Sequence, residues 1–431
     1  MRKLGKVKIS GWNRQNVGNS ILMSISDEDT SVRIKGIARG SGLAYGDAAL
    51  NFSHNIFKFD EKVFDGKFIE DKFDTIVVDA QMKVGDVCKY LIESNRFLPT
   101  VPGSIDATIG GCLSADVHGK NDHRSGSFGR SVVALQILDQ NGITTIKDNH
   151  PEFKFHVSSF GLTGIFKRVE IKTKPLQGNK LLASTYIVSS LSELLESMTQ
   201  LKDSHEYVVG WMDYVNKNRR GFIEVADWGV GKSTCNKKNL KFRIPANFPN
   251  VINRFTIGIY NCLVFRLAKR KSSRGVYELA YDNYLFPTLA IQNWNFLFGK
   301  NGFHEIQILV KDQHVKELEK ELNLISKQFP IFLAGFKRIE KEGIGLMSFP
   351  SQGWSVAINI PGKYISKEEV GAILVNLYNK FECRQYLAKD SALTVKLAEK
   401  MYPNMDEFRA YREHKKLNNF FISEMSLRLN L

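Results

Sequence analysis

The sequence predicts an α+β protein with two or three domains. Its 431 residues exceed the usual size of one domain, and 43% of them are hydrophobic, which suits a folded globular chain. Up to about residue 175, short apolar segments alternate with glycine-rich turns. After Pro175 these turns thin out, and longer strand-like and helical segments alternate. We therefore place a domain boundary near Pro175.

The first region is expected to contain short strands and one clear helix. The strand-like segments are residues 32–38, 75–79, 132–138 and 165–173. Within residues 83–95 the apolar side chains recur at i, i+3, i+4, i+7 and i+8, which places them on one face of a helix. The pair Asn141-Gly142, between two apolar residues, predicts a tight hairpin turn.

The second region is expected to be an α+β module. The predicted strand and helix pairs are 182–188 with 190–201, 304–310 with 314–327, and 354–360 with 368–381. An apolar run over residues 255–265 is followed at once by basic residues up to Arg274. Two interpretations of this run stay open. It is either a buried segment followed by a solvated basic loop, or a segment that lies on an anionic bilayer.

Charge and composition narrow the class of partner. Sixty Lys and Arg against 45 Asp and Glu give a net charge of +15, which favours nucleic acid, a phosphorylated molecule or a membrane surface. No nucleic-acid-binding motif supports the first of these. The N-terminus lacks the apolar core of a secretory signal, and no run of 18 apolar residues occurs, so a cytoplasmic protein is expected. The five cysteines never show CxxC spacing, so neither a disulfide framework nor a metal site is expected.

Two glycine-rich segments point to a large phosphorylated cofactor. The first is RGSGLAYGD at residues 39–47, directly after a predicted strand, and the second extends over residues 102–129. Glycines let backbone N–H groups approach a phosphate without clashes from Cβ atoms. The first segment does not continue into the helix and acidic residue of a Rossmann fingerprint. One glycine triplet alone is compatible with a structural turn, whereas the two segments together favour a cofactor.

These segments, with GLTGI at residues 161–165, resemble the FAD-binding domain of the vanillyl-alcohol-oxidase type, also called PCMH-type. They resemble in particular the polyprenyl-phosphoryl-ribose 2'-oxidases of that family, the flavin subunits of an epimerase. GWMD at 210–213, SFP at 348–350 and AKDS at 388–391 match in order, so the resemblance covers nearly the whole chain. It implies a two-part FAD-binding domain, residues 1–175 and 385–431, with an α+β substrate-binding domain, residues 176–384, inserted between the parts.

The resemblance implies FAD as the cofactor and a non-covalent mode of binding. Related oxidases join a histidine of the first loop to the flavin, and Leu43 occupies that place. The residues implied to hold the pyrophosphate are Ala38, Arg39, Gly40, Ser41, Gly42, Leu43, Ala44, Tyr45, Gly46, Asp47 and Ala48. Those implied to line the flavin are Gly103, Thr108, Ile109, Gly110, Gly111, Ala115, Asp116, Val117, His118, Ile165 and Tyr386.

The activity implied by the resemblance is oxidation of a sugar 2'-hydroxyl to a ketone, which needs a base and a cation beside the cofactor. Lys389 and His118 are the candidate catalytic residues. Which of them takes the proton stays open, and a structural role for His118 has equal weight. The residues implied to contact the substrate are Lys120, Trp211, Glu305, Gln307, Lys337 and Lys389. Trp211 and Trp354 are equally compatible with plain core packing.

Three positions depart from the family pattern. Ala357 stands in place of a cysteine, Glu305 of a glutamine and Ser355 of an asparagine, so the sugar and the lipid stay open. The implied partners are a polyprenyl-phosphoryl pentose, an NAD(P)H-dependent short-chain reductase and the inner face of the plasma membrane, in cell-envelope polysaccharide synthesis. The alternative enzyme is an FAD-dependent oxidase of a soluble alditol, sugar or sugar lactone.

Overall fold

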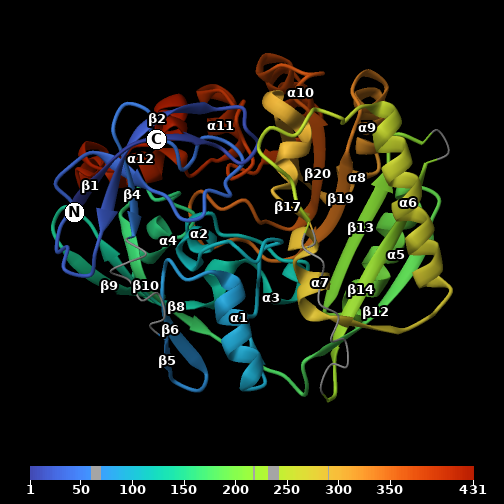
Figure 1. The fold of residues 1–431 in the computed structure, drawn as a ribbon, viewed down its shortest axis with the longest axis horizontal. Helices are drawn as coiled ribbons and strands as arrows, with labels where there is room; N and C mark the ends of the chain where they lie inside the picture. The colour runs from blue at the N-terminus through green and yellow to red at the C-terminus, as the bar shows by residue number, and fades with distance from the viewer. Residues whose placement is uncertain (60–68, 217–218, 232–241, 290) are drawn as a thin grey trace.

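The computed structural model describes residues 1–59, 69–216, 219–231, 242–289 and 291–431. Within these residues the chain forms a four-stranded, a five-stranded and an eight-stranded sheet, together with two short two-stranded pairs. In Figure 1 the two smaller sheets lie on the left with the N-terminus, and the eight-stranded sheet lies on the right. The protein is therefore an α+β structure, as predicted.

The four-stranded sheet has the order β1 (Arg2–Ser10), β2 (Val17–Ile25), β4 (Asn55–Phe59), β3 (Gly36–Ala38). The β1–β2 hairpin was not predicted, because its strands are mostly half-exposed and β1 is rich in lysine. The predicted strand at 32–38 is confirmed only for its last three residues. The N–H of Val32 donates to the carbonyl of Asp139 instead of joining a strand ladder.

The five-stranded sheet has the order β5 (Ile69–Asp71), β6 (Thr75–Asp79), β10 (Ile165–Lys172), β8 (Val132–Leu138), β9 (Ile143–Lys147). The hairpin turn between β8 and β9 is confirmed, with Gly142 at φ +134°. The predicted helix is α1 (Val84–Glu93), whose apolar face is buried. Short elements complete this part: β7 (Arg96–Phe97), α2 (Ile109–Ser114), α3 (Asp122–Ser125), α4 (Phe153–His156) and β11 (Lys174–Pro175).

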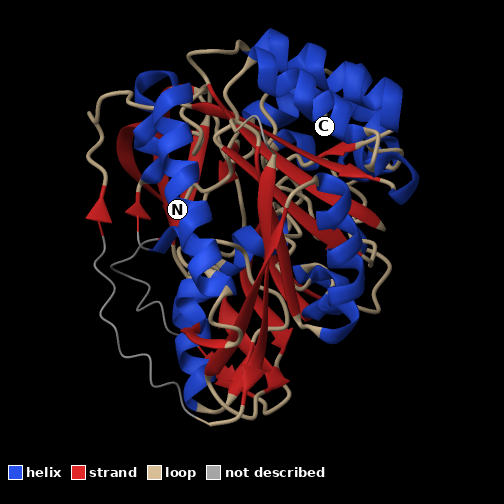
Figure 2. Cartoon of the chain, turned by 90° about the vertical axis from the view of Figure 1, so that its right-hand side faces the viewer, coloured by secondary structure: helices blue, strands red, loops and turns tan. Residues whose placement is uncertain are grey.

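The eight-stranded sheet has the order β16 (Tyr277–Ala280), β12 (Lys180–Val188), β14 (Arg220–Gly229), β13 (Tyr207–Asp213), β19 (Leu333–Ile339), β20 (Gly353–Pro361), β18 (Phe303–Val310), β21 (Arg384–Gln385). Figure 2 shows helices flanking its long strands. The helices of this part are α5 (Leu191–Ser204), α6 (Arg254–Ser272), α7 (Tyr281–Leu285), α8 (Asp312–Val315), α9 (Leu318–Gln328) and α10 (Lys367–Phe381). A parallel pair, β15 (Phe242–Arg243) and β17 (Ile291–Gln292), lies outside the sheet.

The prediction of one helix over residues 314–327 is wrong. Two helices, α8 and α9, occupy this region, because hydrogen bonds from Glu319 to Lys316 and from Lys320 to Glu317 span three residues instead of four. The run at 255–265 is part of helix α6, and its apolar side chains are not buried as a set. Among the described residues, no helix has the length and apolar character needed to cross a membrane.

The C-terminal residues contact the N-terminal sheets. Helices α11 (Val395–Met401), α12 (Met405–His414) and α13 (Glu424–Leu429) lie beside the blue strands β2 and β4 in Figure 1. The N–H of Gly36 donates to the carbonyl of Phe420 at 2.8 Å, and the N–H of Ile422 donates back to Gly36 at 3.0 Å. Phe421 is fully buried against the N-terminal part of the chain. The two ends of the sequence therefore share one core.

Candidate functional site

A cavity of about 950 Å³ is lined by residues from the four-stranded, the five-stranded and the eight-stranded sheets. Its lining comes from the first glycine segment, from residues 101–120, from strands β13, β18, β19 and β20, and from Ala388-Lys389. A volume at the upper end of the range for small-molecule sites suits a large cofactor together with a substrate. The cavity brings together most of the predicted cofactor residues and all six predicted substrate residues.

The first glycine segment lines the cavity with a buried cation behind it. The guanidinium of Arg39 donates to the carbonyls of Ser10 at 2.8 Å and Ala49 at 3.0 Å. Burial lowers the pKa of Arg39 to about 10, yet the side chain stays charged at neutral pH, and no carboxylate in the described part of the chain pairs with it. An unpaired buried cation favours an anionic ligand at this loop.

Glycine is required at this loop by close contacts. Gly42 has φ +70°, and a Cβ there would overlap the guanidinium of Arg39. A Cβ on Gly40 would overlap Oγ1 of Thr108. That hydroxyl accepts a hydrogen bond from the N–H of Gly111 at 3.1 Å and so caps α2. The two glycine segments, 60 residues apart, are thus in direct contact.

Four of the predicted cofactor residues lie outside the cavity lining: Gly46, Asp47, Ile109 and Asp116. A Cβ on Gly46 would overlap the backbone of Asp390, so this glycine permits a chain crossing. Ile109 is fully buried in the core. The carboxylate of Asp116 accepts from the N–H of Gly129 at 2.9 Å and from the Ser348 hydroxyl at 2.6 Å. These residues support the loops and do not face the cavity.

Three of the lysines that line the cavity, Lys120, Lys337 and Lys389, come from different segments of the chain. Burial lowers the pKa of Lys120 to about 8, and burial with the nearby Lys120 and Lys389 lowers the pKa of Lys337 to about 8. The ammonium of Lys120 lies 4.1 Å from the ring centroid of Tyr284 and donates to the backbone carbonyl of that residue. Several cations in one cavity are suited to a phosphorylated substrate.

Lys389 is held by an acidic and an aromatic neighbour. Its Nζ lies 3.2 Å from Oε1 of Glu305 and 3.2 Å from the ring centroid of Tyr45. The other carboxylate oxygen of Glu305 accepts from the amide of Asn359 at 2.5 Å. Burial lowers the pKa of Lys389, and the charge of Glu305 opposes that shift. The sequence could not assign Tyr45 as a neighbour of Lys389 or Asn359 as a partner of Glu305, because each comes from a distant segment.

His118 presents one ring nitrogen to a partner and leaves the other without one. Nε2 lies 2.7 Å from Nε2 of Gln307, which also donates to the Ser355 hydroxyl at 3.0 Å. Nδ1 is buried and has no hydrogen-bond partner in the described chain. Burial, followed by the charges of Lys337 and Lys389, lowers the pKa of His118 well below its usual range. The ring is neutral, with Nε2 accepting and Nδ1 carrying the proton.

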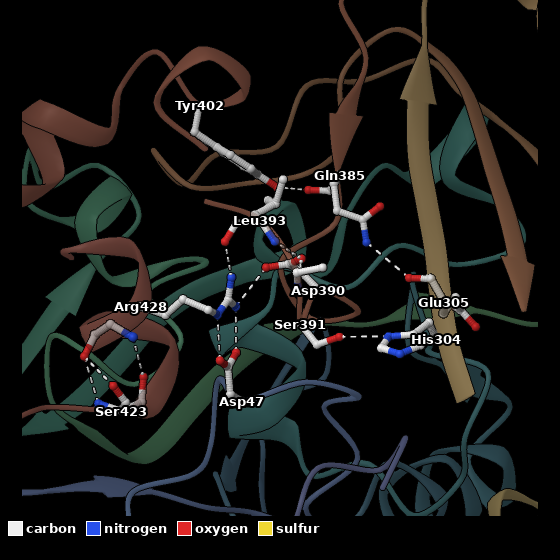
Figure 3. A network of polar contacts seen from close by, with 12 residues as sticks. Asp47, His304, Glu305, Gln385, Asp390, Ser391, Leu393, Tyr402, Ser423 and Arg428 are labelled. Carbon is white, nitrogen blue, oxygen red and sulfur yellow. Dashed lines mark hydrogen bonds and ion pairs between the residues drawn. The ribbon is translucent and has the colours of Figure 1, made fainter. Parts of the chain in front are cut away.

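Figure 3 shows a polar network that joins the cofactor loop to the segment of Lys389. Arg428 of α13 donates to both carboxylate oxygens of Asp47, each at 2.7 Å, and lies 2.9 Å from the carboxylate of Asp390. All three side chains are largely buried. The sequence carries no signal for this network, since Asp47 lies more than 300 residues before Asp390 and Arg428 along the chain.

Of the two tryptophans considered for the substrate site, Trp211 lines the cavity and Trp354 belongs to the core. Trp211 lines the cavity and stacks on Phe222 with ring centroids 5.2 Å apart. Trp354 is buried outside the lining, beneath the guanidinium of Arg338. Lining residues that were not predicted include Trp12, Gln81, Met82, Trp294, Phe336 and Ala388.

Of the five cysteines, Cys235 lies outside the described residues, and the other four are free thiols.

The cavity fits FAD on the chemistry of the residues present. Glycine-rich loops let backbone N–H groups approach a phosphate, Arg39 supplies positive charge that no carboxylate of the described chain pairs, and Nδ1 of His118 is a buried donor that lacks a partner. Leu43 lines the same cavity and has no atom that could bond covalently to a flavin.

Comparison with known proteins agrees with this fit. Residues 27–146 match the model of the FAD binding domain. The chain is 29% identical to decaprenylphosphoryl-beta-D-ribose oxidase of Mycolicibacterium smegmatis, over 98% of this chain and 97% of that protein. It is 24% identical to an uncharacterized protein of Streptomyces coelicolor over 78% of this chain and 96% of that protein. It is 27% identical to D-arabinono-1,4-lactone oxidase of Candida albicans over 38% of this chain and 28% of that protein.

The cofactor prediction and the predicted class of enzyme are thereby confirmed. The chain uses FAD, carries a PCMH-type FAD-binding domain and is an FAD-dependent oxidoreductase that is similar over nearly its whole length to decaprenylphosphoryl-beta-D-ribose oxidase.

Proposed function

We propose that the protein oxidises the 2'-hydroxyl of a polyprenyl-phosphoryl ribose to the 2'-keto sugar. The observation that carries this proposal is a single cavity in which the FAD loops and three buried lysines lie together. A phosphorylated sugar needs cations at its phosphate and a polar group at its reacting hydroxyl, and both are available here. The similarity to a ribose oxidase over 98% of the chain supports the same choice of sugar.

FAD, when bound, supplies the acceptor for the hydride that leaves the sugar carbon. The residues of this chain bind and orient the substrate. Lys389, held by Glu305, lies at the site of reaction, where it would hold positive charge as an ammonium or take the proton of the sugar hydroxyl as a neutral amine, and Lys120 and Lys337 bind the phosphate. His118 lines the cavity, and its Nδ1 has no hydrogen-bond partner within the described residues. Because the lone pair on Nε2 is already engaged by Gln307, His118 is the weaker candidate for the base.

The binding of FAD and the division of the chain form part of the proposal. FAD is held without a covalent bond, since Leu43 stands in the first loop where related oxidases have histidine. Residues 1–175 and 385–431 form the FAD-binding domain, and residues 176–384 form an inserted substrate domain. The contacts of Gly36 with Phe420 and Ile422 support this division. Precipitation of the protein with acid should release all of its flavin into the supernatant.

The proposed reaction is the first half of an epimerisation to the arabinose form. A separate NAD(P)H-dependent short-chain reductase would return the keto sugar to the alcohol with inverted configuration, for use in cell-envelope polysaccharide. The polyprenyl tail of such a substrate would stay in a bilayer while its sugar enters the cavity. Peripheral contact with the cytoplasmic face of a membrane is therefore part of the proposal.

The test is loss of the oxidised-flavin absorption band under anaerobic conditions. Prenyl-phosphoryl ribose should bleach the band, and free alditols and sugar lactones should not. Lys389→Met should retain FAD, measured by absorbance ratio, and lose substrate-dependent bleaching by at least about 100-fold in rate. Bleaching by an alditol or a lactone, with none by the prenyl-phosphoryl pentose, would establish the alternative enzyme. The partial similarity to D-arabinono-1,4-lactone oxidase is the observation that favours that alternative.

A further inference from the structure

Helix α6 carries an exposed apolar stripe. Phe255, Ile259, Leu263 and Leu267 follow one another at intervals of four residues and are 75%, 49%, 53% and 57% exposed. Residues four apart lie on one face of a helix. In Figure 1 the helix runs along the right-hand edge of the molecule. Apolar side chains in such a row are usually buried, so their exposure calls for a partner.

The opposite face of α6 is firmly attached to the protein. Ile257, Asn261 and Ala268 are buried, and the amide of Asn261 donates to the carboxylate of Asp213 at 2.8 Å. An asparagine cap with a reciprocal bond from Thr256 begins the helix. The stripe is therefore presented on a fixed element and does not result from a loosely packed helix.

Positive charge surrounds the stripe and no negative charge lies near it in sequence. Residues 242–277 contain no Asp or Glu. The exposed cations of the C-terminal half of the helix and the turn after it are Arg266, Lys269, Arg270 and Arg274. None of these four side chains forms an ion pair within the described part of the chain, whereas Lys271 pairs with Glu224. Arg266 and Arg270 lie on the same side of the helix as the stripe, by the rotation of 100° per residue.

We propose that this face of α6 binds the surface of an anionic lipid bilayer. The apolar stripe enters the boundary between headgroups and acyl chains, and the four cations contact lipid phosphates and carboxylates. A second copy of the chain is a poor partner, because a two-fold contact would place the four unpaired cations of one copy against those of the other. Nucleic acid would satisfy the cations but leave the apolar stripe in water.

The inward side of helix α6 is linked to the cavity lining through a short series of contacts. Lys271 of α6 contacts Glu224 at 2.7 Å, and the Tyr284 hydroxyl donates to the carbonyl of Glu224 at 3.2 Å. Tyr284 in turn holds Lys120 in the cavity lining. A substrate whose sugar phosphate is tethered to lipid would therefore meet the enzyme at the side where Lys120 lies. This step rests on the proposed lipid-linked substrate, whereas bilayer binding by α6 does not.

The experiment is flotation of the full-length FAD-loaded protein with vesicles of phosphatidylcholine alone or with 30 mol% phosphatidylglycerol. The wild-type protein should float with the anionic vesicles and not with the neutral ones, and 0.5 M salt should weaken the binding. Arg266→Glu/Arg270→Glu should lower the partition coefficient by at least about 30-fold, given the usual contribution of each basic residue at a membrane. Phe255→Ser/Leu263→Ser should lower it by about tenfold or more.

Matched controls change exposed side chains of the same charge or apolar character away from α6. Lys147→Glu/Lys396→Glu makes the same change of net charge on β9 and α11, and Phe73→Ser/Leu427→Ser removes two other exposed apolar side chains. Both controls should float like the wild type. The FAD content and circular dichroism of every variant should be unchanged.

Three outcomes would overturn the inference. These are an absence of flotation, equal flotation of the α6 variants and the wild type, and a dimer in sedimentation velocity that only the α6 variants lose. The last of these would assign the stripe to contact between copies. Flotation that depends on α6, in a protein that fails to oxidise prenyl-phosphoryl ribose, would leave the membrane surface established and reject the proposed substrate.

Discussion

Lys389 and Glu305 form an ion pair inside the cavity, with 3.2 Å between Nζ and Oε1. Glu305 is only 7% exposed, and its second oxygen is engaged by Asn359. Burial lowers the pKa of Lys389, and the carboxylate counteracts that effect. The pair thus favours the ammonium form of Lys389 at a position where burial alone would favour the neutral amine.

Glu305→Gln should therefore lower the pKa of Lys389 further. If the ammonium is the active form, kcat/KM falls as the pH rises through that pKa, and the falling limb should move to lower pH in the variant. The measurement is kcat/KM against pH for both proteins. Glu93→Gln, at an exposed carboxylate on α1, is the control and should leave the profile unchanged. A limb that rises with pH, and shifts in the same direction, would instead identify the neutral amine as the base.

Gln307→Glu should restore the titration of His118. In the native protein burial and two lysines keep this histidine neutral, so its ring signals should not change between pH 5 and 8. A carboxylate 2.7 Å from Nε2 would raise the pKa of His118 by stabilising the imidazolium. The measurement is an NMR titration, with the signal assigned by its loss in His118→Gln. Titration of His118 near pH 6.5 in the native protein would contradict the prediction.

Gly40→Ala should weaken FAD binding by at least about tenfold, because the added Cβ overlaps Oγ1 of Thr108 and displaces the loop. The dissociation constant can be measured by flavin fluorescence after FAD is removed and added back. Gly258→Ala is the matched control, since a Cβ there meets only Cγ1 of Val215, at an ordinary contact distance of 3.7 Å, and Gly258 lies outside the cavity lining. Equal FAD affinity of the two variants would show that the contact between the glycine segments does not shape the site.

Arg428→Met should destabilise the protein by about 3–5 kcal/mol, because it leaves the buried carboxylates of Asp47 and Asp390 without their cation. Arg428→Lys should recover only part of this loss, since an ammonium cannot make the bidentate contact with Asp47. The free energy of unfolding in urea is the measurement. Lys154→Met, which breaks an exposed pair with Glu407, should cost less than about 1 kcal/mol. A similar loss of unfolding free energy in Arg428→Met and Lys154→Met would show that the burial of the Arg428 pairs does not make them more stabilising than an exposed pair.

Ala357 predicts resistance to nitroaromatic inhibitors that react with a cysteine in the family. It lines the cavity and has no nucleophilic atom, so mass spectrometry should find no stoichiometric adduct after turnover with such a compound. Ala357→Cys should acquire the adduct. Ala334→Cys, on the neighbouring strand β19 but outside the cavity lining, should not. An adduct on the unaltered protein would contradict the prediction.

Local sequence patterns were sufficient to predict the elements with strong apolar periodicity and the presence of a phosphorylated cofactor. The stripe of α1, the hairpin turn at Gly142 and the strand β8 were predicted correctly, because each depends on residues that are neighbours along the chain. The glycine segments indicated a large phosphorylated cofactor for the same reason, since backbone approach to a phosphate depends on local glycine content, and the family resemblance of these segments implied FAD. The β1–β2 hairpin and the break between α8 and α9 escaped prediction, because neither carries a strong apolar period.

What the sequence by itself determined is the class of fold, the cofactor and the candidate residues. Which of them act together was decided only by the tertiary structure. Asp116 turns its carboxylate to Gly129 and Ser348, Asp47 pairs with Arg428, and Lys389 meets Glu305 from a strand more than 80 residues away. For the apolar run of α6, the sequence left both a buried and an exposed segment open, and the structure places its stripe on the exposed surface. The physical reason is that burial, pairing and pKa depend on every charge and apolar surface nearby in space, whereas sequence periodicity reports only those that are near along the chain.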